Sequence, residues 1–357
     1  MKLFEQATLG TLKLKNKVVM APMTRSRAIQ NTPGDIMVDY YSQRASAGLI
    51  ITEGASPSPN GLGYARIPGL FNTEQEKGWK KVTDGVHAKG GKIFLQIMHT
   101  GRVGHPLNMQ ANARILAPSA LALSGKMWTD SQGEQPFPTP IAMSESDIKE
   151  AVKEYVHCAE LAIQAGFDGV ELHCANGYLM EQFLNPNCNK RTDSYGGSPK
   201  GLMAFPLEVA SQVSKKIGSH RTGIRISPYG VFNDTGAFAG IDEFYVEFTK
   251  ELNALNLVYL HVVDHSSMGA PAVSATLKRD MRAIFKGAYI LSGGYNAERA
   301  EADLIENKGD LVAFGRPFIA NPDLVPVMMA KMSLNEADQS KFYTPGPEGY
   351  SVYPSRT

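Results

Sequence analysis

Eight short apolar runs, most of them followed by a helix-like pattern, constrain the fold of this chain more than any other feature. Their apolar residues are continuous rather than alternating, which is typical of parallel strands buried on both faces. The helical pattern is plainest at residues 144–165, 244–255 and 297–306, and Ser144 with Asp147 indicates a helix start. This repetition predicts an α/β fold, a closed (β/α)8 TIM barrel in one domain over residues 1–357. The predicted strands are 18–23, 49–55, 92–97, 169–175, 222–228, 258–264, 288–294 and 311–317.

One connection interrupts the repetition. Residues 98–143 are rich in Pro, Ser, Gly and Ala and show no clear helix. A loop of this length in a compact domain is usually a lid or a binding loop. Because it follows the third predicted strand, we expect it to form a capping insertion over the catalytic face. A decorative surface insertion is the alternative.

The composition narrows the possible partners. The chain has 36 basic and 35 acidic residues, which argues against a broad surface for nucleic acid or anionic membrane. No apolar run reaches the roughly 18 residues that a membrane span needs, and the amino terminus has no signal-peptide core. Three cysteines, Cys158, Cys174 and Cys188, match neither a disulfide framework nor a zinc spacing. We expect a cytoplasmic protein with unpaired thiols, either a monomer or a homodimer, acting on small molecules.

The segment 169–197 holds the first candidate site. Its apolar start is followed at once by His173, Asn176 and Tyr178. In a parallel barrel, residues just past a strand point into the catalytic pocket. His173 and Asn176 can both donate to one carbonyl or phenolate oxygen. Tyr178, with an ordinary pKa of about 10, can give a proton to carbon. A structural histidine beside an Asn-Gly turn is the competing interpretation.

The ends of the other predicted strands should converge on the same pocket. Paired glycines and an arginine after the seventh and eighth strands are typical of a phosphate site. A ligand with a phosphate, a flat body and an amide-rich ring would satisfy the whole set, which describes FMN. Each feature alone is weak, because Gly-Gly is commonly a turn and a buried polar group can be satisfied locally. The residues predicted to bind FMN are Pro22, Met23, Thr24, Ala55, Gln96, Arg225, Gly293, Gly294, Gly315 and Arg316.

Other chemistries find less support. No lysine lies at a strand end to form a Schiff base, and no His, Asp or Glu cluster has metal-ligand spacing. The prediction is therefore a flavin site without a metal.

Along nearly its whole length the chain resembles the old yellow enzyme family of flavin-dependent ene-reductases. The resemblance rests on several long motifs in the right order. They are KVVMAPMTRSR at 17–27, HCANGYL at 173–179, QFL at 182–184 with NKRTDSYGG at 189–197, FGRPFIANPD at 314–323 and EGYSVYP at 348–354.

The resemblance implies non-covalent FMN and NAD(P)H as the electron donor. Thr24 would bind near flavin O4, Gln96 the pyrimidine edge, and Arg225 would face N1 and O2. Gly293, Gly294, Gly315 and Arg316, at the ends of the last two predicted strands, would hold the phosphate. An α,β-unsaturated carbonyl would then replace NAD(P)H, with its oxygen on His173 and Asn176. Flavin N5 would give hydride to Cβ while Tyr178 protonates Cα, in a ping-pong cycle.

The chain differs from the family pattern at three places, and the first of them bears on the substrate. Met98 stands where many members have Trp, which predicts a wider or reshaped pocket. Asn176 is one of two residue types that the family uses there, and it cannot become cationic. Residues 199–202 read PKGL where the family usually has Glu-Asn-Arg, a difference expected to affect the anchoring of the next helix rather than the chemistry. Tyr64 and Tyr343 match positions at the pocket mouth and would contact substrate together with Met98.

Three alternatives stay open at this point. A nitrate-ester or nitro-compound reductase of the same family would use the same flavin. A phosphosugar isomerase or aldolase would share the phosphate site but lacks a Schiff-base lysine. A flavin-binding sensor would bind the cofactor without turning over an alkene.

Overall fold

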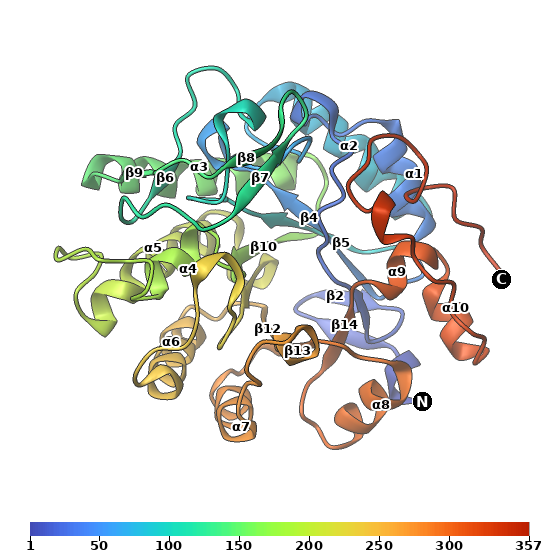
Figure 1. The fold of residues 1–357 in the computed structure, drawn as a ribbon. Helices are drawn as coiled ribbons and strands as arrows, with labels where there is room; N and C mark the ends of the chain where they lie inside the picture. The colour runs from blue at the N-terminus through green and yellow to red at the C-terminus, as the bar shows by residue number, and fades with distance from the viewer. Residues whose placement is uncertain (357) are drawn as a thin grey trace.

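Eight parallel strands close into a barrel in the computed structural model, which describes residues 1–356 (Figure 1). The order around the barrel is β10-β11-β12-β13-β14-β3-β4-β5. The predicted (β/α)8 architecture is thus confirmed, and residue 357 of the predicted domain lies outside the described residues. The barrel strands are β3 (Val18–Met20), β4 (Leu49–Ala55), β5 (Ile93–Ile97), β10 (Gly169–Cys174), β11 (Thr222–Ile226), β12 (Tyr259–Val263), β13 (Ala288–Ser292) and β14 (Leu311–Phe314).

The helices surround this barrel (Figure 1). The start predicted at Ser144 is confirmed: its hydroxyl accepts from Asp147 N at 3.2 Å, and Asp147 Oδ2 accepts from Ser144 N at 2.9 Å. This capping box satisfies backbone donors that the first turn leaves free. The helices are α1 (Asp35–Gln43), α2 (Thr73–Ala88), α3 (Glu145–Gln164), α4 (Leu179–Leu184), α5 (Pro199–Ile217), α6 (Ile241–Ala254), α7 (Ala275–Ile284), α8 (Ala297–Ile305), α9 (Pro317–Ala320) and α10 (Leu324–Met329).

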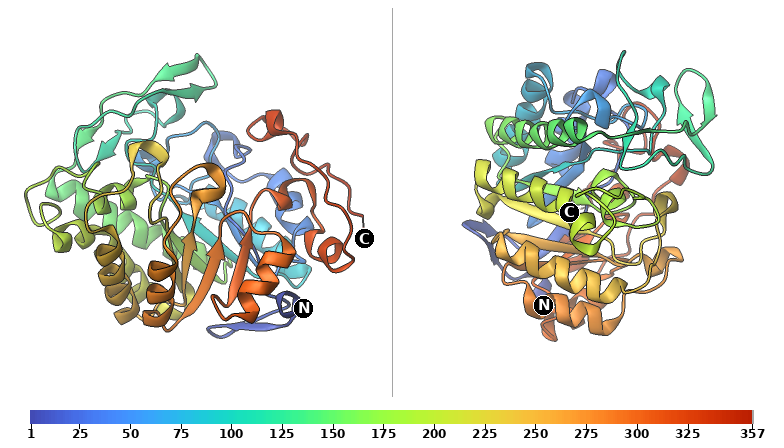
Figure 2. Two further views of the ribbon diagram at one scale, coloured as in Figure 1. Left: turned by 60° about the horizontal axis from the view of Figure 1, so that its bottom comes forward. Right: turned by 90° about the vertical axis from the view of Figure 1, so that its left-hand side faces the viewer.

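An N-terminal hairpin closes one end of the barrel. Strands β1 (Ala7–Leu9) and β2 (Leu12–Leu14) pair antiparallel. Leu9 and Leu14 are buried in one cluster with Phe94 and Tyr259 from the barrel. In Figure 2 (left) this hairpin lies at the end opposite the capping insertion. The N-terminal end is therefore packed core, and the carboxyl ends of the strands are left for the site.

The insertion after β5 has little helix, as predicted. It contains the short parallel pair β6 (Leu116–Ala117) and β9 (Ile141–Ala142) and an antiparallel hairpin, β7 (Lys126–Thr129) and β8 (Gly133–Pro136). The sequence did not indicate this hairpin. Met127, Trp128 and Phe137 line a cavity at the barrel mouth. The insertion therefore caps the site rather than decorating the surface.

The C-terminal segment is tied to the loop after β3. Arg25 Nη2 donates to Gly349 O at 2.6 Å, and Arg27 Nη1 donates to Phe342 O at 2.6 Å. The Arg27 guanidinium also lies 4.9 Å from the centre of the Tyr350 ring. These contacts hold the segment at the barrel mouth, on the same side as the insertion (Figure 2, left).

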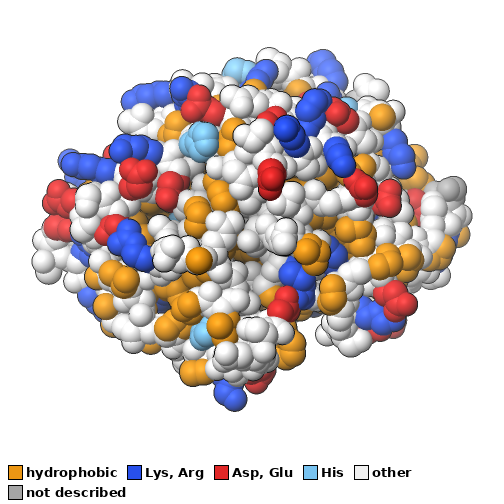
Figure 3. Space-filling model, turned by 90° about the horizontal axis from the view of Figure 1, so that it is seen from above, with side chains coloured by type: hydrophobic (Ala, Val, Ile, Leu, Met, Phe, Trp, Pro, Cys, Tyr) orange, Lys and Arg blue, Asp and Glu red, His pale blue; other side chains and the backbone are white. Residues whose placement is uncertain are grey.

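Two further sequence expectations concern the surface and the thiols. Lys and Arg lie interspersed with Asp and Glu on the face drawn in Figure 3. Cys158, Cys174 and Cys188 are buried and unpaired. Among the described residues, no helix combines the length and the apolar character that crossing a membrane requires.

Candidate active site

Two cavities with a common wall occupy the carboxyl ends of the barrel strands. The first, of about 670 Å³, reaches the ends of β13 and β14, and the second, of about 1150 Å³, lies under the insertion. The residues common to both linings are Pro22, Thr24, Tyr64, Asn176, Tyr178, Arg225, Asn233 and Tyr343. Residues from nearly every strand end therefore meet in one bipartite space.

The structure brings together most of the residues that the sequence singled out. Met23, Gly293, Gly294, Gly315 and Arg316 line the first cavity. Gln96, Met98 and His173 line the second.

Ala55 is the exception. It is fully buried at the end of β4, where its carbonyl accepts from Met98 N at 2.9 Å, and it is absent from both linings. Its role in binding the flavin stays a prediction.

His173 lies beside Tyr178 in the wall of the second cavity. Burial, reinforced by repulsion from Arg225, lowers the pKa of His173, so the ring is neutral near pH 7. Its Nδ1 is buried and has no hydrogen-bond partner in the described part of the chain. The Tyr178 ring lies edge-on, 5.0 Å from the His173 ring. Burial raises the pKa of Tyr178, which keeps its hydroxyl protonated.

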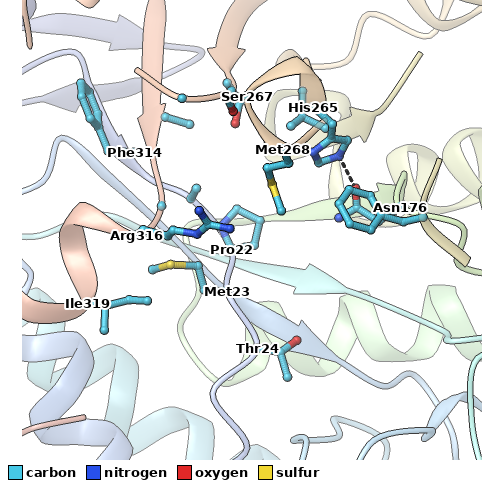
Figure 4. Close-up of a pocket in the computed structure, with 18 of the residues that line it drawn as sticks. Pro22, Met23, Thr24, Asn176, His265, Ser267, Met268, Phe314, Arg316 and Ile319 are labelled. Atoms are coloured by element: carbon cyan, nitrogen blue, oxygen red, sulfur yellow. Dashed lines mark hydrogen bonds between the residues drawn. The ribbon is translucent and has the colours of Figure 1, made fainter. Parts of the chain in front are cut away.

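Asn176 is held from three directions. Its φ of 60° is left-handed, a conformation that asparagine tolerates better than most residues. Asn176 N donates to Ser227 Oγ at 2.9 Å, and Asn233 Nδ2 donates to its carbonyl at 2.7 Å. The side-chain Oδ1 lies 2.7 Å from His265 Nε2 (Figure 4). Backbone and side chain are therefore both fixed.

A buried polar cluster lies inside the barrel below the common wall. Glu171 is fully buried; its Oε1 accepts from Gln96 Nε2 at 2.8 Å, and its Oε2 lies 2.8 Å from His261 Nδ1. Arg225 is buried beside them, and its Nε lacks a partner within residues 1–356. Burial lowers the pKa of Arg225 while Glu171 opposes that shift, and a guanidinium stays charged near neutrality. Its unused donor suits an electron-rich ring edge in the cavity.

The ends of β13 and β14 form the cradle expected for a phosphate. Gly293 and Gly294 have φ of 127° and 63°, which disfavour any side chain. A Cβ on Gly293 would lie 2.1 Å from Asp264 O, so only glycine fits. The Arg316 guanidinium lines the same cavity (Figure 4) and makes no hydrogen bond or ion pair to the described residues. The Arg316 guanidinium, next to the backbone of two glycines that carry no side chain, can therefore bind a phosphate group.

The chain belongs to the NADH:flavin oxidoreductase / NADH oxidase family, whose sequence model matches residues 2–335. It is 39% identical to 12-oxophytodienoate reductase 7 of Oryza sativa subsp. japonica, over 99% of this chain and 94% of that protein. It is 40% identical to a probable flavin mononucleotide-dependent alkene reductase of Leishmania infantum, over 97% of this chain and 95% of that protein. Morphinone reductase shares the fold with a TM-score of 0.96, at 42% identity over 99% of this chain and 96% of that one.

The protein is therefore an NAD(P)H-dependent flavin oxidoreductase that uses FMN. The resemblance to the old yellow enzyme family is confirmed, and the phosphosugar alternative is excluded.

Several residues of the site were not predicted from the sequence, among them Glu171, Asn233, His261 and His265. Glu171 falls within a run that reads as an apolar strand. His265 is the second residue after the sixth barrel strand, β12. The rule that strand-end residues face the pocket, applied there as it was elsewhere, would have found it.

Proposed function

We propose that this enzyme reduces the C=C bond of α,β-unsaturated carbonyl compounds and related activated alkenes with NAD(P)H. The proposal is carried by one observation: neutral His173, the amide of Asn176 and the protonated hydroxyl of Tyr178 border the same cavity. Two oxygen-binding groups and a weak acid are what conjugate reduction needs from a protein.

The cofactor would lie along the wall between the two cavities. Arg316 and the backbone of Gly293, Gly294 and Gly315 would hold its phosphate. Thr24, Gln96 and Arg225 would hold its ring system, Arg225 with the Nε that has no acceptor among the described residues. FMN held by these residues would supply the hydride chemistry that links oxidation of NAD(P)H to reduction at the β-carbon of the alkene.

His173 and Asn176 would bind the carbonyl oxygen of the substrate. Negative charge grows on this oxygen as the alkene is reduced, so donors already aimed at it lower the barrier. Because His173 is neutral and Asn176 does not titrate, their donation should change little around neutral pH.

Tyr178 would supply the second hydrogen, as a proton to the α-carbon. Its raised pKa keeps the proton in place until the substrate becomes basic enough to take it. The resulting phenolate would be stabilised by the hydroxyl of Tyr64, 3.0 Å away, and by the positive charge of Arg225. NAD(P)H and the alkene would use the same space in turn, which makes the cycle ping-pong.

The visible spectrum of the purified enzyme during titration with a para-substituted phenol is the first test. We expect flavin bands and a new long-wavelength charge-transfer band as the phenolate binds. Tyr178→Phe should retain flavin reduction by NAD(P)H and lose most cyclohexenone turnover. Unchanged turnover in that variant would remove Tyr178 from the reaction. Faster reduction of a nitrate ester than of any enone would favour the nitro-compound alternative.

A further inference from the structure

A histidine from a different strand end contacts the amide of Asn176. His265 Nε2 lies 2.7 Å from Asn176 Oδ1, and Figure 4 shows the two side chains meeting at the cavity edge. Asn176 follows β10 and His265 follows β12. The contact therefore joins two strand ends that do not neighbour each other in the barrel.

His265 is itself firmly held. It begins the 3-10 turn η7 (His265–Met268), which Asp264 caps by accepting from Ser266 N at 2.9 Å. The Asp264 carboxylate also pairs with Lys278. The ring of Phe232 packs edge-on against the His265 imidazole at 4.7 Å. A group so anchored can hold another side chain in place.

The direction of the Asn176 amide decides what it offers to a ligand. Its backbone is fixed by Ser227 and Asn233, so the remaining freedom is a flip that exchanges Oδ1 and Nδ2. With Nδ2 toward the cavity, the amide donates to a negatively charged oxygen. With Oδ1 toward the cavity, it would repel that oxygen.

The hydrogen bond to His265 matches the arrangement in which Asn176 Nδ2 faces the cavity. Burial, with repulsion from Arg225, lowers the pKa of His265 to about 4, so near neutrality the ring carries one hydrogen. That hydrogen must be on Nε2 for the ring to donate to Oδ1. Asn176 Nδ2 is then the free end, and it donates to no acceptor within the described residues.

We propose that His265 is a positioning residue that orients the Asn176 amide so that its NH2 group faces the substrate oxygen. This rests on the proposed role of Asn176 as a donor. His265 acts through Asn176 and makes no contact with the reacting atoms.

A double-mutant cycle on phenol binding tests this. The variants are His265→Leu, which removes the donor, His265→Gln, which keeps a donor at the same reach, Asn176→Ala, and His265→Leu with Asn176→Ala. Affinity is read from the charge-transfer band, with FMN content as the control for folding. His265→Phe serves as a second variant without a donor, because its ring can still pack against Phe232.

We expect His265→Leu and His265→Phe to weaken phenol binding by about tenfold, the effect of one hydrogen bond to a charged ligand. His265→Gln should remain within about threefold of the parent. In the Asn176→Ala background, His265→Leu should have no further effect, because coupled residues are not additive.

Two results would overturn the proposal. Additive losses in the cycle would mean that His265 acts without Asn176. Parent-like affinity of His265→Leu, while Asn176→Ala binds weakly, would mean that the amide keeps its direction unaided. If Asn176→Ala itself binds like the parent, the donor pair of the proposed function fails first, and the role of His265 fails with it.

Discussion

The hydroxyl oxygens of Tyr64 and Tyr178 lie 3.0 Å apart, and both side chains line both cavities. The two rings meet edge-on at 6.2 Å, so the hydrogen bond is supported by packing. Tyr64 comes from the connection after β4 and Tyr178 from the start of α4. The proposed proton donor is therefore held by a residue far from it in the sequence.

Tyr64→Phe should slow the step in which the alkene is reduced. A hydrogen bond to a charged group contributes about 1.5–3 kcal/mol, so loss of the bond to the Tyr178 phenolate should slow this step by about tenfold or more. Reduction of the flavin by NAD(P)H should stay within about twofold, since no proton leaves Tyr178 in that half of the cycle. Stopped-flow measurement of the two half-reactions separates these effects. Tyr229→Phe, whose hydroxyl binds Asp242 outside both cavities, is the matched control. Equal slowing of both half-reactions would contradict the assignment.

Glu171→Gln should raise the reduction potential of the bound flavin. The carboxylate lies below the common wall and contacts Gln96, which would hold the ring. Reduction adds negative charge to the flavin, so removing a nearby negative charge favours the reduced form. We expect a rise of about 30 mV, which corresponds to about 1.4 kcal/mol for a two-electron couple. Spectroelectrochemical titration measures it. Glu208→Gln, on the outer helix α5, is the control, and a potential equal to the parent's would show that Glu171 has no electrostatic effect on the ring.

Met98→Trp should narrow the second cavity. Met98 packs directly over Gly54, where a Cβ would lie 2.7 Å from the Met98 Sδ. The larger ring must therefore extend toward the substrate space, because the space over Gly54 is filled. We expect kcat/KM for a bulky cyclic enone to fall by about tenfold relative to cyclohexenone, the scale of a changed apolar pocket. A parallel fall for both substrates would indicate damage to the fold instead.

Glu53 should make the enzyme less stable as the pH rises from about 5 to 8. Burial raises the pKa of this carboxyl to about 7, above the roughly 4.3 of a free glutamate. The folded chain therefore keeps a proton that the unfolded chain has released, and its stabilising effect is lost as the pH rises through the folded pKa.

Glu53→Gln removes this titration. The parent Tm should fall by about 1–2 °C for each kcal/mol that is lost, whereas the variant should change less over the same range. Scanning calorimetry of both proteins at pH 5.5 and pH 8 makes the comparison. Parallel pH profiles would show that Glu53 titrates alike in the folded and unfolded chains.

The sequence predicted the barrel well because its strands are buried on both faces. A run that opens with several apolar residues, such as 49–55, is typical of a strand buried on both faces, and β4 has those bounds. Predicted strands that ran on to a proline, as at Pro22 and Pro228, end earlier in the structure. Proline has no N–H for the ladder, so the pairing stops before it.

Hydrogen bonds from side chains to backbone carbonyls could not be predicted from the sequence. Arg25 and Arg27 stood out only as part of a family motif, because their partners are carbonyls with no sequence signature. The hairpin β7–β8 was missed for another reason. Its half-exposed residues around Trp128 alternate over only four positions, too short a pattern to recognise.

The hydrogen bond from Arg25 to Gly349 has a consequence for the order in which the enzyme folds during synthesis. The two residues are separated by 324 positions: Arg25 belongs to the loop after the first barrel strand, and Gly349 follows the last barrel strand, β14. Tyr343, in the segment that these arginines hold, borders both cavities. A ribosome-bound chain can thus form every barrel strand and still lack this part of the pocket rim. Completion of the active site should therefore wait for the segment that follows β14, and closure of the barrel alone should leave it unfinished.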